Sequence, residues 1–300
     1  MNRIKGIVYT IISAVIFGVT PILAKNTFLG GSTAIMLTFF RGIMPIPIIY
    51  LILKIKKVDM RLQRKELVQV LILSLLGTAF TTVTLYSSYN YISVGMTTTI
   101  HFIYPSLVTI GGILFFKDKV SIIKIIALIF STIGVLMFFD GKTTGNTIGI
   151  VLAIVSGISY AFYMLFIEKT GLRLINSLLI TFYICVINAI FMFIFATLTN
   201  QITFKLTLDA WIYTFVIAIL NSLGAVNLLQ LGIKYIGAST AAILCTFEPI
   251  TSVILGIFLL NEEKSMNVVI GCLFVIAAVI ILSLPKKKQA DLEENTAQTF

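Results

Sequence analysis

Few residues of this chain carry charge: 11% of its 300 residues are charged and 58% are hydrophobic, whereas soluble domains average about 25% charged residues. A chain with so little charge cannot cover a folded surface in water, which excludes a soluble globular protein. The net charge of +10 would favour a nucleic-acid partner in a soluble chain. The positions of the charges give it another meaning here, and we expect no nucleic-acid partner.

Cysteine, histidine and the signatures of several enzyme classes are also scarce. The three cysteines, Cys185, Cys245 and Cys272, all lie in apolar stretches, and an odd number there predicts neither a disulfide framework nor a metal site. No G-x-x-x-x-G-K-S/T phosphate loop is present, which argues against ATP-driven pumping by this chain. No aspartate lies inside an apolar run, and His101 lacks an acidic residue at the spacing of an acyltransferase. We therefore expect no catalytic residues, no cofactor and no metal.

Long apolar runs dominate what is present. There are ten of them, at approximately 6–25, 33–53, 67–90, 95–116, 122–139, 147–167, 177–198, 211–233, 239–260 and 267–284. A helix rises about 1.5 Å per residue, so runs of about 20 residues can cross a hydrocarbon core about 30 Å thick. Strands of a membrane barrel would be alternating segments of about ten residues. The pattern predicts an all-α integral membrane protein with ten transmembrane helices, the first of which is too long for a signal peptide.

Lysine and arginine are distributed unevenly between the polar breaks. If the N-terminus is cytoplasmic, the cytoplasmic segments hold 17 of the 22 basic residues, the outer segments hold 4, and Arg41 lies inside a run. Membrane proteins keep their basic excess on the cytoplasmic side. We therefore expect both termini in the cytoplasm and Trp211 at the outer end of its run. The cluster from Lys54 to Lys65 is the main topology determinant and a candidate site for anionic lipid headgroups.

The chain also repeats itself. At an offset of 144 positions Pro105 corresponds to Pro249, and other landmarks keep a shift of 143 or 144. The predicted units are a first five-helix repeat at 1–144, a second at 145–284 and a cytoplasmic polar tail at 285–300. Because five is odd, the second repeat enters the membrane in the opposite sense, and inverted repeats of this kind are typical of secondary transporters that work by alternating access.

One charged residue interrupts the apolar run 239–260 near its middle. Glu248 lies there, directly before Pro249. A carboxylate at mid-membrane costs on the order of 3 kcal/mol, and the proline removes a backbone donor, so the helix is expected to kink or open at this point. An ionisable residue beside a helix defect favours a functional site. The alternative is a protonated glutamate that is hydrogen-bonded inside the bundle and serves packing only.

Polar side chains concentrate in the runs 67–90, 95–116, 211–233 and 239–260. Polar groups in a membrane protein face the bundle interior or a water-filled cavity rather than lipid. The first of these runs corresponds to the third by the repeat, and the second corresponds to the fourth. We therefore expect these four helices to line a central cavity, whereas the runs 122–139 and 267–284 are almost purely apolar and face lipid.

The candidate substrate-binding residues come from these helices. They are Glu248, His101, Tyr104, Tyr86, Asn221, Gln230 and Thr97. Thr97, His101 and Tyr104 are spaced i, i+4, i+7 and share one face of a helix. His101 is either a neutral hydrogen-bonded wall residue or a proton carrier. For the two amides, hydrogen bonds that hold the bundle together are as plausible as contacts to a substrate.

Three further features are interpreted as structural. Pro105 and Pro249 are candidate hinges. Arg41 lies mid-run and needs a carboxylate or helix-end carbonyls as a partner; Glu248 is one candidate, and a structural role is favoured. Small residues at four-residue spacing predict close helix packing. These stripes are Thr10, Ala14 and Gly18 in the first run, and Ala153, Gly157 and Ala161 in the sixth.

Several of these residues carry a resemblance to a known family. Phe39-Phe40-Arg41 and Phe247-Glu248-Pro249, followed by Gly256-Ile257-Phe258-Leu259 and Glu262, resemble the drug/metabolite transporter superfamily, EamA type, over about residues 5–284. Lys117-Asp118 departs from the Gly-Glu that is usual in the first half. The resemblance implies a central cavity lined by both repeats, and export of amino acids and related small metabolites across the bacterial cytoplasmic membrane.

The leading hypothesis is thus a secondary transporter of small polar organic molecules with a small-molecule substrate, the lipid bilayer as its environment and protons as a candidate coupling ion. The alternatives are an intramembrane enzyme, which lacks a catalytic set here, and a passive channel or scaffold. Inverted repeats with a buried carboxylate favour a carrier over a channel. The sequence does not define the oligomeric state.

The distribution of basic residues generates a prediction about topology. A reporter fused at Gly145 should report the outer side, and one fused at the C-terminus should report the cytoplasm, because an odd number of crossings separates the two points. Reporters on the same side of the membrane would contradict both the ten-helix count and the inverted repeat.

Overall fold

The computed structural model describes residues 2–118, 121–137, 146–260 and 266–284, with the backbone alone at 253, 256–260 and 268. The first half contains α1 (Asn2–Leu29), α2 (Ala34–Ile43), α3 (Ile46–Ile55), α4 (Arg64–Ile72), the π-helix η1 (Leu73–Ala79), α5 (Phe80–Ser88), α6 (Val94–His101), α7 (Tyr104–Phe116) and α8 (Ile122–Leu136). The second half contains α9 (Thr147–Lys169), the 3₁₀ turn η2 (Gly171–Leu174), α10 (Ser177–Leu198), α11 (Leu208–Ile219), the π-helix η3 (Leu220–Val226), α12 (Asn227–Ile236), α13 (Ala238–Leu244), α14 (Phe247–Leu260) and α15 (Met266–Ser283).

These elements form ten membrane-crossing segments, as the apolar runs predict. Seven helical segments of 22 to 29 residues in the described part of the chain are long and apolar enough to span a membrane. The shorter α8 and α15 and the interrupted pair α13–α14 complete the ten. The all-α membrane fold class is therefore confirmed.

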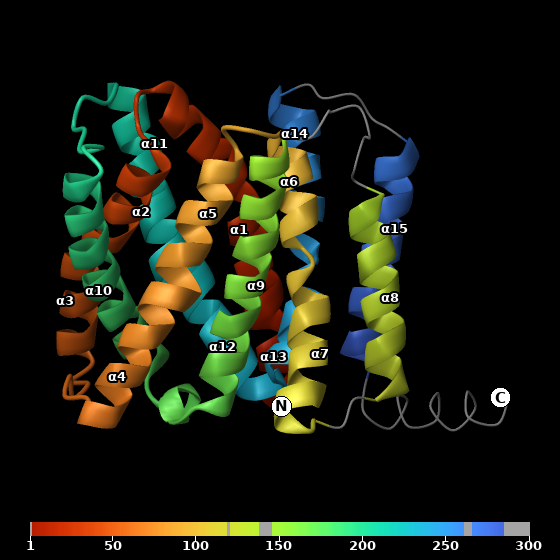
Figure 1. Cartoon of the computed structure of the whole chain (residues 1–300). Helices are drawn as coiled ribbons and strands as arrows, with labels where there is room; N and C mark the ends of the chain where they lie inside the picture. Colours follow the sequence, from red (N-terminus) through yellow and green to blue (C-terminus); the bar gives the residue numbers. More distant parts are fainter. Residues whose placement is uncertain (1, 119–120, 138–145, 261–265, 285–300) are drawn as a thin grey trace, which may run out of the picture.

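The bundle begins and ends at the same side (Figure 1). The Arg3 guanidinium donates hydrogen bonds to the carbonyls of Leu282 and Leu284, at 2.8 and 2.7 Å. The C-terminal end of a helix carries partial negative charge, so a cation there is favourable. The contact joins the start of the first crossing to the end of the last, which requires an even number of crossings.

The two halves interleave. The first helix of the first half, α1, packs against α12 and α14 of the second half, and α9 packs against α5, α6 and α7 of the first. Corresponding helices also meet in pairs, α2 with α10 and α8 with α15. The core of the molecule is thus a seam between the two halves.

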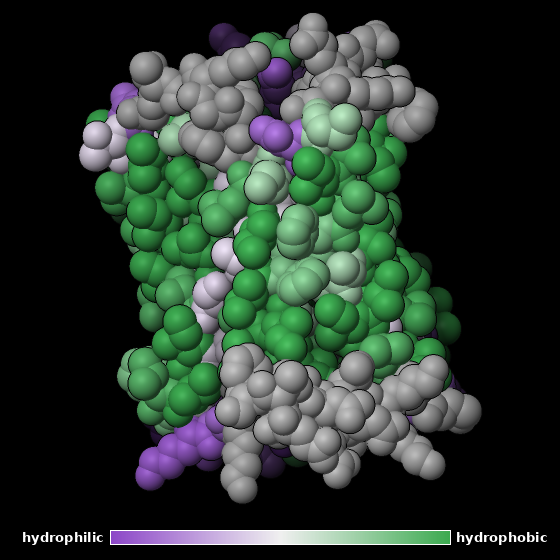
Figure 2. Space-filling model, turned by 90° about the vertical axis from the view of Figure 1, so that its right-hand side faces the viewer, coloured by the Kyte–Doolittle hydropathy of each residue, from purple (hydrophilic) through white to green (hydrophobic). Residues whose placement is uncertain are grey.

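The pair α8 and α15 stands at one edge of the bundle (Figure 1). Their outward side chains are apolar and exposed, with Ile129 at 51% and Ile276 at 38%. Figure 2 shows this edge as a hydrophobic band across the middle of the molecule. The band is the surface expected to contact lipid tails, as predicted for these two helices.

Both π-helical segments occur at corresponding places, in the third crossing of each half. Each contains a glycine that packs closely against the first helix of the other half. A Cβ added to Gly77 would lie 3.0 Å from the Tyr163 Cβ, and one added to Gly224 would lie 2.8 Å from Ile16 Cδ1. A π-bulge inside a helix frequently accompanies a functional site, and here both bulges lie on the seam.

The predicted small-residue stripes lie on the same seam. Ala14, Gly18, Ala153, Gly157 and Ala161 are all buried. A Cβ on Gly18 would lie 2.6 Å from the Glu248 carbonyl oxygen, and one on Gly157 would lie 2.7 Å from the His101 carbonyl oxygen. The stripes therefore bring α1 and α9 against the chain at the two residues that the sequence marks as candidates for function.

These contacts predict a stability difference between glycines. Gly18→Ala and Gly157→Ala should each destabilise the purified protein by about 1–3 kcal/mol, because the new methyl group collides with backbone of another helix. Gly95→Ala is the matched control, since nothing lies within 4 Å of a Cβ at that position. Thermal unfolding in detergent measures the difference, and equal melting temperatures for the three variants would contradict the close packing.

Candidate functional site

Two helix interruptions at corresponding positions organise the centre of the bundle. Helix α6 ends at His101 and α7 begins at Tyr104, while α13 ends at Leu244 and α14 begins at Phe247. Pro105 and Pro249 lie in the first turns of α7 and α14, where a residue without an N–H fits best. The break that the sequence predicts at Pro249 is present, and Pro105 has the same setting in the other half.

Tyr104 and Glu248 are equivalent by the repeat, and each directly precedes its proline. Tyr104 is fully buried and begins an aromatic group with rings from α6, α7 and α9. Its ring meets Tyr160 edge-on at 4.8 Å, and Tyr160 stacks on Tyr163 at 5.7 Å. His101 lies 5.3 Å from Tyr104 and 5.4 Å from Tyr160, between ring centroids. Such pairs fix ring positions and leave polar edges available.

Glu248 faces this aromatic group and has no partner of its own. Its carboxylate lies within electrostatic reach of Tyr86, Tyr89, Tyr104 and Tyr160. Among the described residues, no hydrogen bond or ion pair is made by its side chain, and part of its surface stays accessible. The site therefore holds an acid that pairs with no cation among the described residues.

Arg41 supplies the opposite charge from α2. Its Nη1 donates to the Tyr86 hydroxyl at 3.0 Å, and its guanidinium carbon lies 5.7 Å from the centre of that ring. The Ser222 hydroxyl, in η3, donates to the Arg41 carbonyl at 3.2 Å. No ion pair joins Arg41 to Glu248 in the described part of the chain, so the pairing that the sequence left open is not made. Tyr86, Tyr89 and Tyr160 lie within electrostatic reach of both charges.

His101 is held by a single hydrogen bond. Its Nδ1 lies 2.8 Å from Ser156 Oγ, and that hydroxyl donates to the Ala153 carbonyl at 2.7 Å. A serine has one proton to donate, so Nδ1 is assigned as the donor and Nε2 as the free position. The arrangement fixes the ring against Tyr104 and Tyr160 and leaves one nitrogen able to accept a hydrogen bond.

The remaining candidates form hydrogen bonds with residues other than Glu248. Thr97 bonds to Ser88 at 2.9 Å between α6 and α5. Asn221 accepts from Thr20 at 3.1 Å, and its Nδ2 is buried without a partner. Gln230 donates to the Tyr163 hydroxyl at 3.2 Å, and its Oε1 is also unsatisfied. Of these three, Gln230 alone connects to the aromatic group, through Tyr163.

Sequence reasoning missed three residues of this group: Tyr89, Tyr160 and Ser156. The run 147–167 was interpreted only by its small-residue stripe, although Ser156 and Tyr160 flank Gly157 on that helix. Their spacing of four residues places both on one face, and the face that buries Gly157 also presents them to His101. A search for polar residues beside the stripe would have found them.

Ten apolar crossings in two inverted halves define an integral membrane protein with the repeat architecture typical of secondary transporters. The chain belongs to the EamA-like transporter family, whose profile matches residues 4–139 and again 147–284. It is 24% identical over 305 residues to an uncharacterized transporter of Clostridium kluyveri, covering 97% of this chain and 96% of the relative. An uncharacterized transporter of Bacillus subtilis, YvbV, is 22% identical over 67% of this chain and 66% of its own.

A solved structure supports the fold. A crystal structure with 12% sequence identity superposes with a TM-score of 0.78 and covers 94% of this chain and 96% of its own. At this identity the likeness concerns the fold alone.

The Arg41–Tyr86 contact generates a prediction. Tyr86→Phe keeps the ring, which packs edge-on against Phe28 at 5.8 Å, but removes the acceptor of a buried charged donor. We expect a loss of about 1–3 kcal/mol of stability. Tyr91→Phe, at a tyrosine that is 45% exposed, should change stability by about 0.5 kcal/mol or less. Equal effects in thermal unfolding would mean that Arg41 does not depend on this hydroxyl.

Proposed function

We propose that this protein is a secondary transporter that moves small polar organic metabolites, amino acids or related compounds, across the bacterial cytoplasmic membrane by alternating access. Both termini lie in the cytoplasm in this proposal, as the distribution of basic residues favours. Export is the direction that the resemblance to superfamily exporters supports. Protons are the candidate coupling ion.

The unpaired Glu248 is the observation that carries the proposal. An ionised carboxylate without a partner in a low-dielectric interior is strongly unfavourable, and a permanent structural acid would be expected to have hydrogen bonds. Glu248 has neither a cation nor a donor among the described residues. A substrate ammonium group or a proton would neutralise it, and exchange of the two at one carboxylate couples transport of one to movement of the other.

Arg41 supports a substrate with two charged ends. Within the described part of the chain it donates one hydrogen bond to a side chain, that of Tyr86, although a guanidinium has five N–H donors in a planar fork suited to carboxylates. Because the same tyrosines lie within reach of Arg41 and Glu248, a compound that carries an amine and a carboxylate can be bound between opposite charges. Tyrosine hydroxyls and ring faces then serve the uncharged part of the molecule.

The arrangement of the halves supports alternating access. Helix breaks and π-helical segments are places where a backbone can change direction without losing a whole ladder of hydrogen bonds. Both kinds of interruption occur in each half, and all of them lie where one half packs against the other. Rocking of the two halves about this seam would open the site first to one side and then to the other.

Neutralising the carboxylate tests the proposal. Glu248→Gln keeps the shape of the side chain but cannot ionise, so in proteoliposomes net uptake of radiolabelled amino acids should fall at least about tenfold. If Glu248 exchanges protons, substrate exchange across the membrane should be retained better than net flux. Glu66→Gln is the matched control and should leave transport unchanged. The Glu66 carboxylate accepts a hydrogen bond from the Gln63 N–H at the start of α4.

Net transport by Glu248→Gln within twofold of the unmodified protein, at equal reconstitution, would remove the carboxylate from the transport cycle. Counterflow in the same vesicles distinguishes a carrier from a channel. Vesicles preloaded with unlabelled substrate transiently accumulate external labelled substrate through a carrier but not through a channel.

A further inference from the structure

A second polar group lies far from Glu248, at the end of the bundle where α1 begins and α15 ends. It surrounds a cavity of about 220 Å³ between α7, α9 and the α12–α13 junction. Charged residues line the cavity from both halves, with Asp118 and Lys124 from the first half and Glu168 from the second. The proposed topology places this cavity on the cytoplasmic side.

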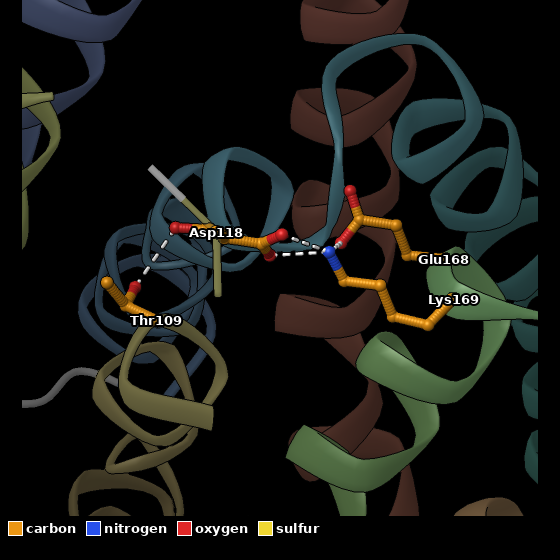
Figure 3. A network of polar contacts seen from close by, with 5 residues as sticks. Thr109, Asp118, Glu168 and Lys169 are labelled. Carbon is orange, nitrogen blue, oxygen red and sulfur yellow. Dashed lines mark hydrogen bonds and ion pairs between the residues drawn. The ribbon is translucent and has the colours of Figure 1, made fainter. Parts of the chain in front are cut away.

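An ion pair across the two halves holds this end of the bundle together. Lys169, at the end of α9, donates to both carboxylate oxygens of Asp118, which follows α7. The Lys169 ammonium also lies 3.9 Å from Glu168 and 5.2 Å from the centre of the Phe116 ring. Figure 3 shows the ammonium group between the two carboxylates.

The end of α7 orients the Asp118 side chain toward Lys169. Helix α7 ends with Lys117 in the left-handed conformation, at φ 54°, and the Asp118 N–H then bonds back to the Gly112 carbonyl at 3.0 Å. Such a turn satisfies the free carbonyls of a helix end. A Cβ on Gly112 would lie 2.8 Å from Asp118 Oδ2. The glycine therefore leaves the space that the carboxylate occupies.

A pair of hydroxyls also joins the two halves beside this cavity. Thr109 of α7 and Ser239 of α13 lie 3.0 Å apart, oxygen to oxygen, and both line the cavity. Further along the same seam, Tyr104 lies beside Cys245. At about 1.5 Å per residue, five residues place Tyr104 within about 8 Å of Thr109. The cavity thus lies on the same seam between α7 and α13 that leads to the aromatic group and Glu248.

Glu168 connects this network to the junction between α12 and α13. Gly237 joins α12 to α13 with φ at 82°, and a Cβ there would lie 2.8 Å from Glu168 Oε1. Only glycine adopts this conformation readily. Because α13 leads directly to the break before Glu248, a change at Lys169 and its two carboxylates can be passed to the helix that carries the central site.

We propose that the Asp118–Lys169 pair and the Thr109–Ser239 contact are the cytoplasmic gate, and that the cavity which they line is the entry vestibule for substrate. The inference rests on the proposed transport function. The pair is partly exposed, with the Asp118 side chain at 36% and the Lys169 side chain at 20%, and exposed ion pairs contribute little stability. It can therefore be broken in every cycle, which distinguishes a gate from a permanent clamp.

Accessibility of the cavity tests the gate without a known substrate. Val108 is fully buried and lines the cavity. A single cysteine at this position, in a chain whose native cysteines are replaced by alanine, is exposed to a sulfonated membrane-impermeant maleimide on the cytoplasmic face of inside-out vesicles. Asp118→Asn should increase the labelling rate at least about fivefold. Charge exchange by Asp118→Lys with Lys169→Asp should return it to within about twofold of the starting value.

Two controls make the result specific. Asp59→Asn changes an acid in the loop 56–63, outside the network, and should leave the rate unchanged. A cysteine at Leu53 of α3, which is also fully buried, should stay unreactive in the Asp118→Asn background. An unchanged Val108 rate in Asp118→Asn, or parallel labelling at Leu53, would overturn the gate.

The outcomes are separable from those of the proposed function. An unchanged labelling rate together with Glu248-dependent transport would remove the gate and retain the transporter. Increased labelling without any Glu248-dependent transport would retain the opening and remove the assigned function.

Discussion

The structure depends on one electrostatic constraint, a carboxylate in the apolar interior of a membrane bundle without a partner in the described chain. In such a medium a charge must be neutralised or hydrogen-bonded. Glu248 instead lies within electrostatic reach of four tyrosines, and Arg41 is engaged with Tyr86. The arrangement is reasonable for a site that receives its counter-charge from a ligand, and it explains why polar residues of both halves converge on the same seam.

Close packing across the halves places that carboxylate. Gly18 lets α1 approach the Glu248 carbonyl, and Gly157 lets α9 approach the His101 carbonyl. Each half therefore supports the helix break of the other, which gives the breaks a fixed surface to lie against. The edge pair α8 and α15 packs at the side of the bundle and carries none of the central residues.

Hydrophobicity and the repeat were sufficient to predict much of this. The ten crossings, the inversion and the break at Pro249 follow from run length, an odd helix count and a missing N–H. Contacts between helices were harder to predict. Thr97 and His101 are on the same helix α6, yet Thr97 bonds to Ser88 of α5 whereas His101 bonds to Ser156 of α9. Tyr160 and the Asp118–Lys169 pair depend on which helices meet, and periodicity within one helix carries no information about its neighbours.

The central claim is that Glu248 itself receives the charged group of the substrate. Infrared difference spectroscopy measures this most directly, with the carboxyl band of Glu248 identified by its absence in Glu248→Gln. Addition of a transported amine-bearing compound should change that band, whereas an analogue without the amine should not. A Glu248 band that stays the same while the transported compound is bound would contradict the account.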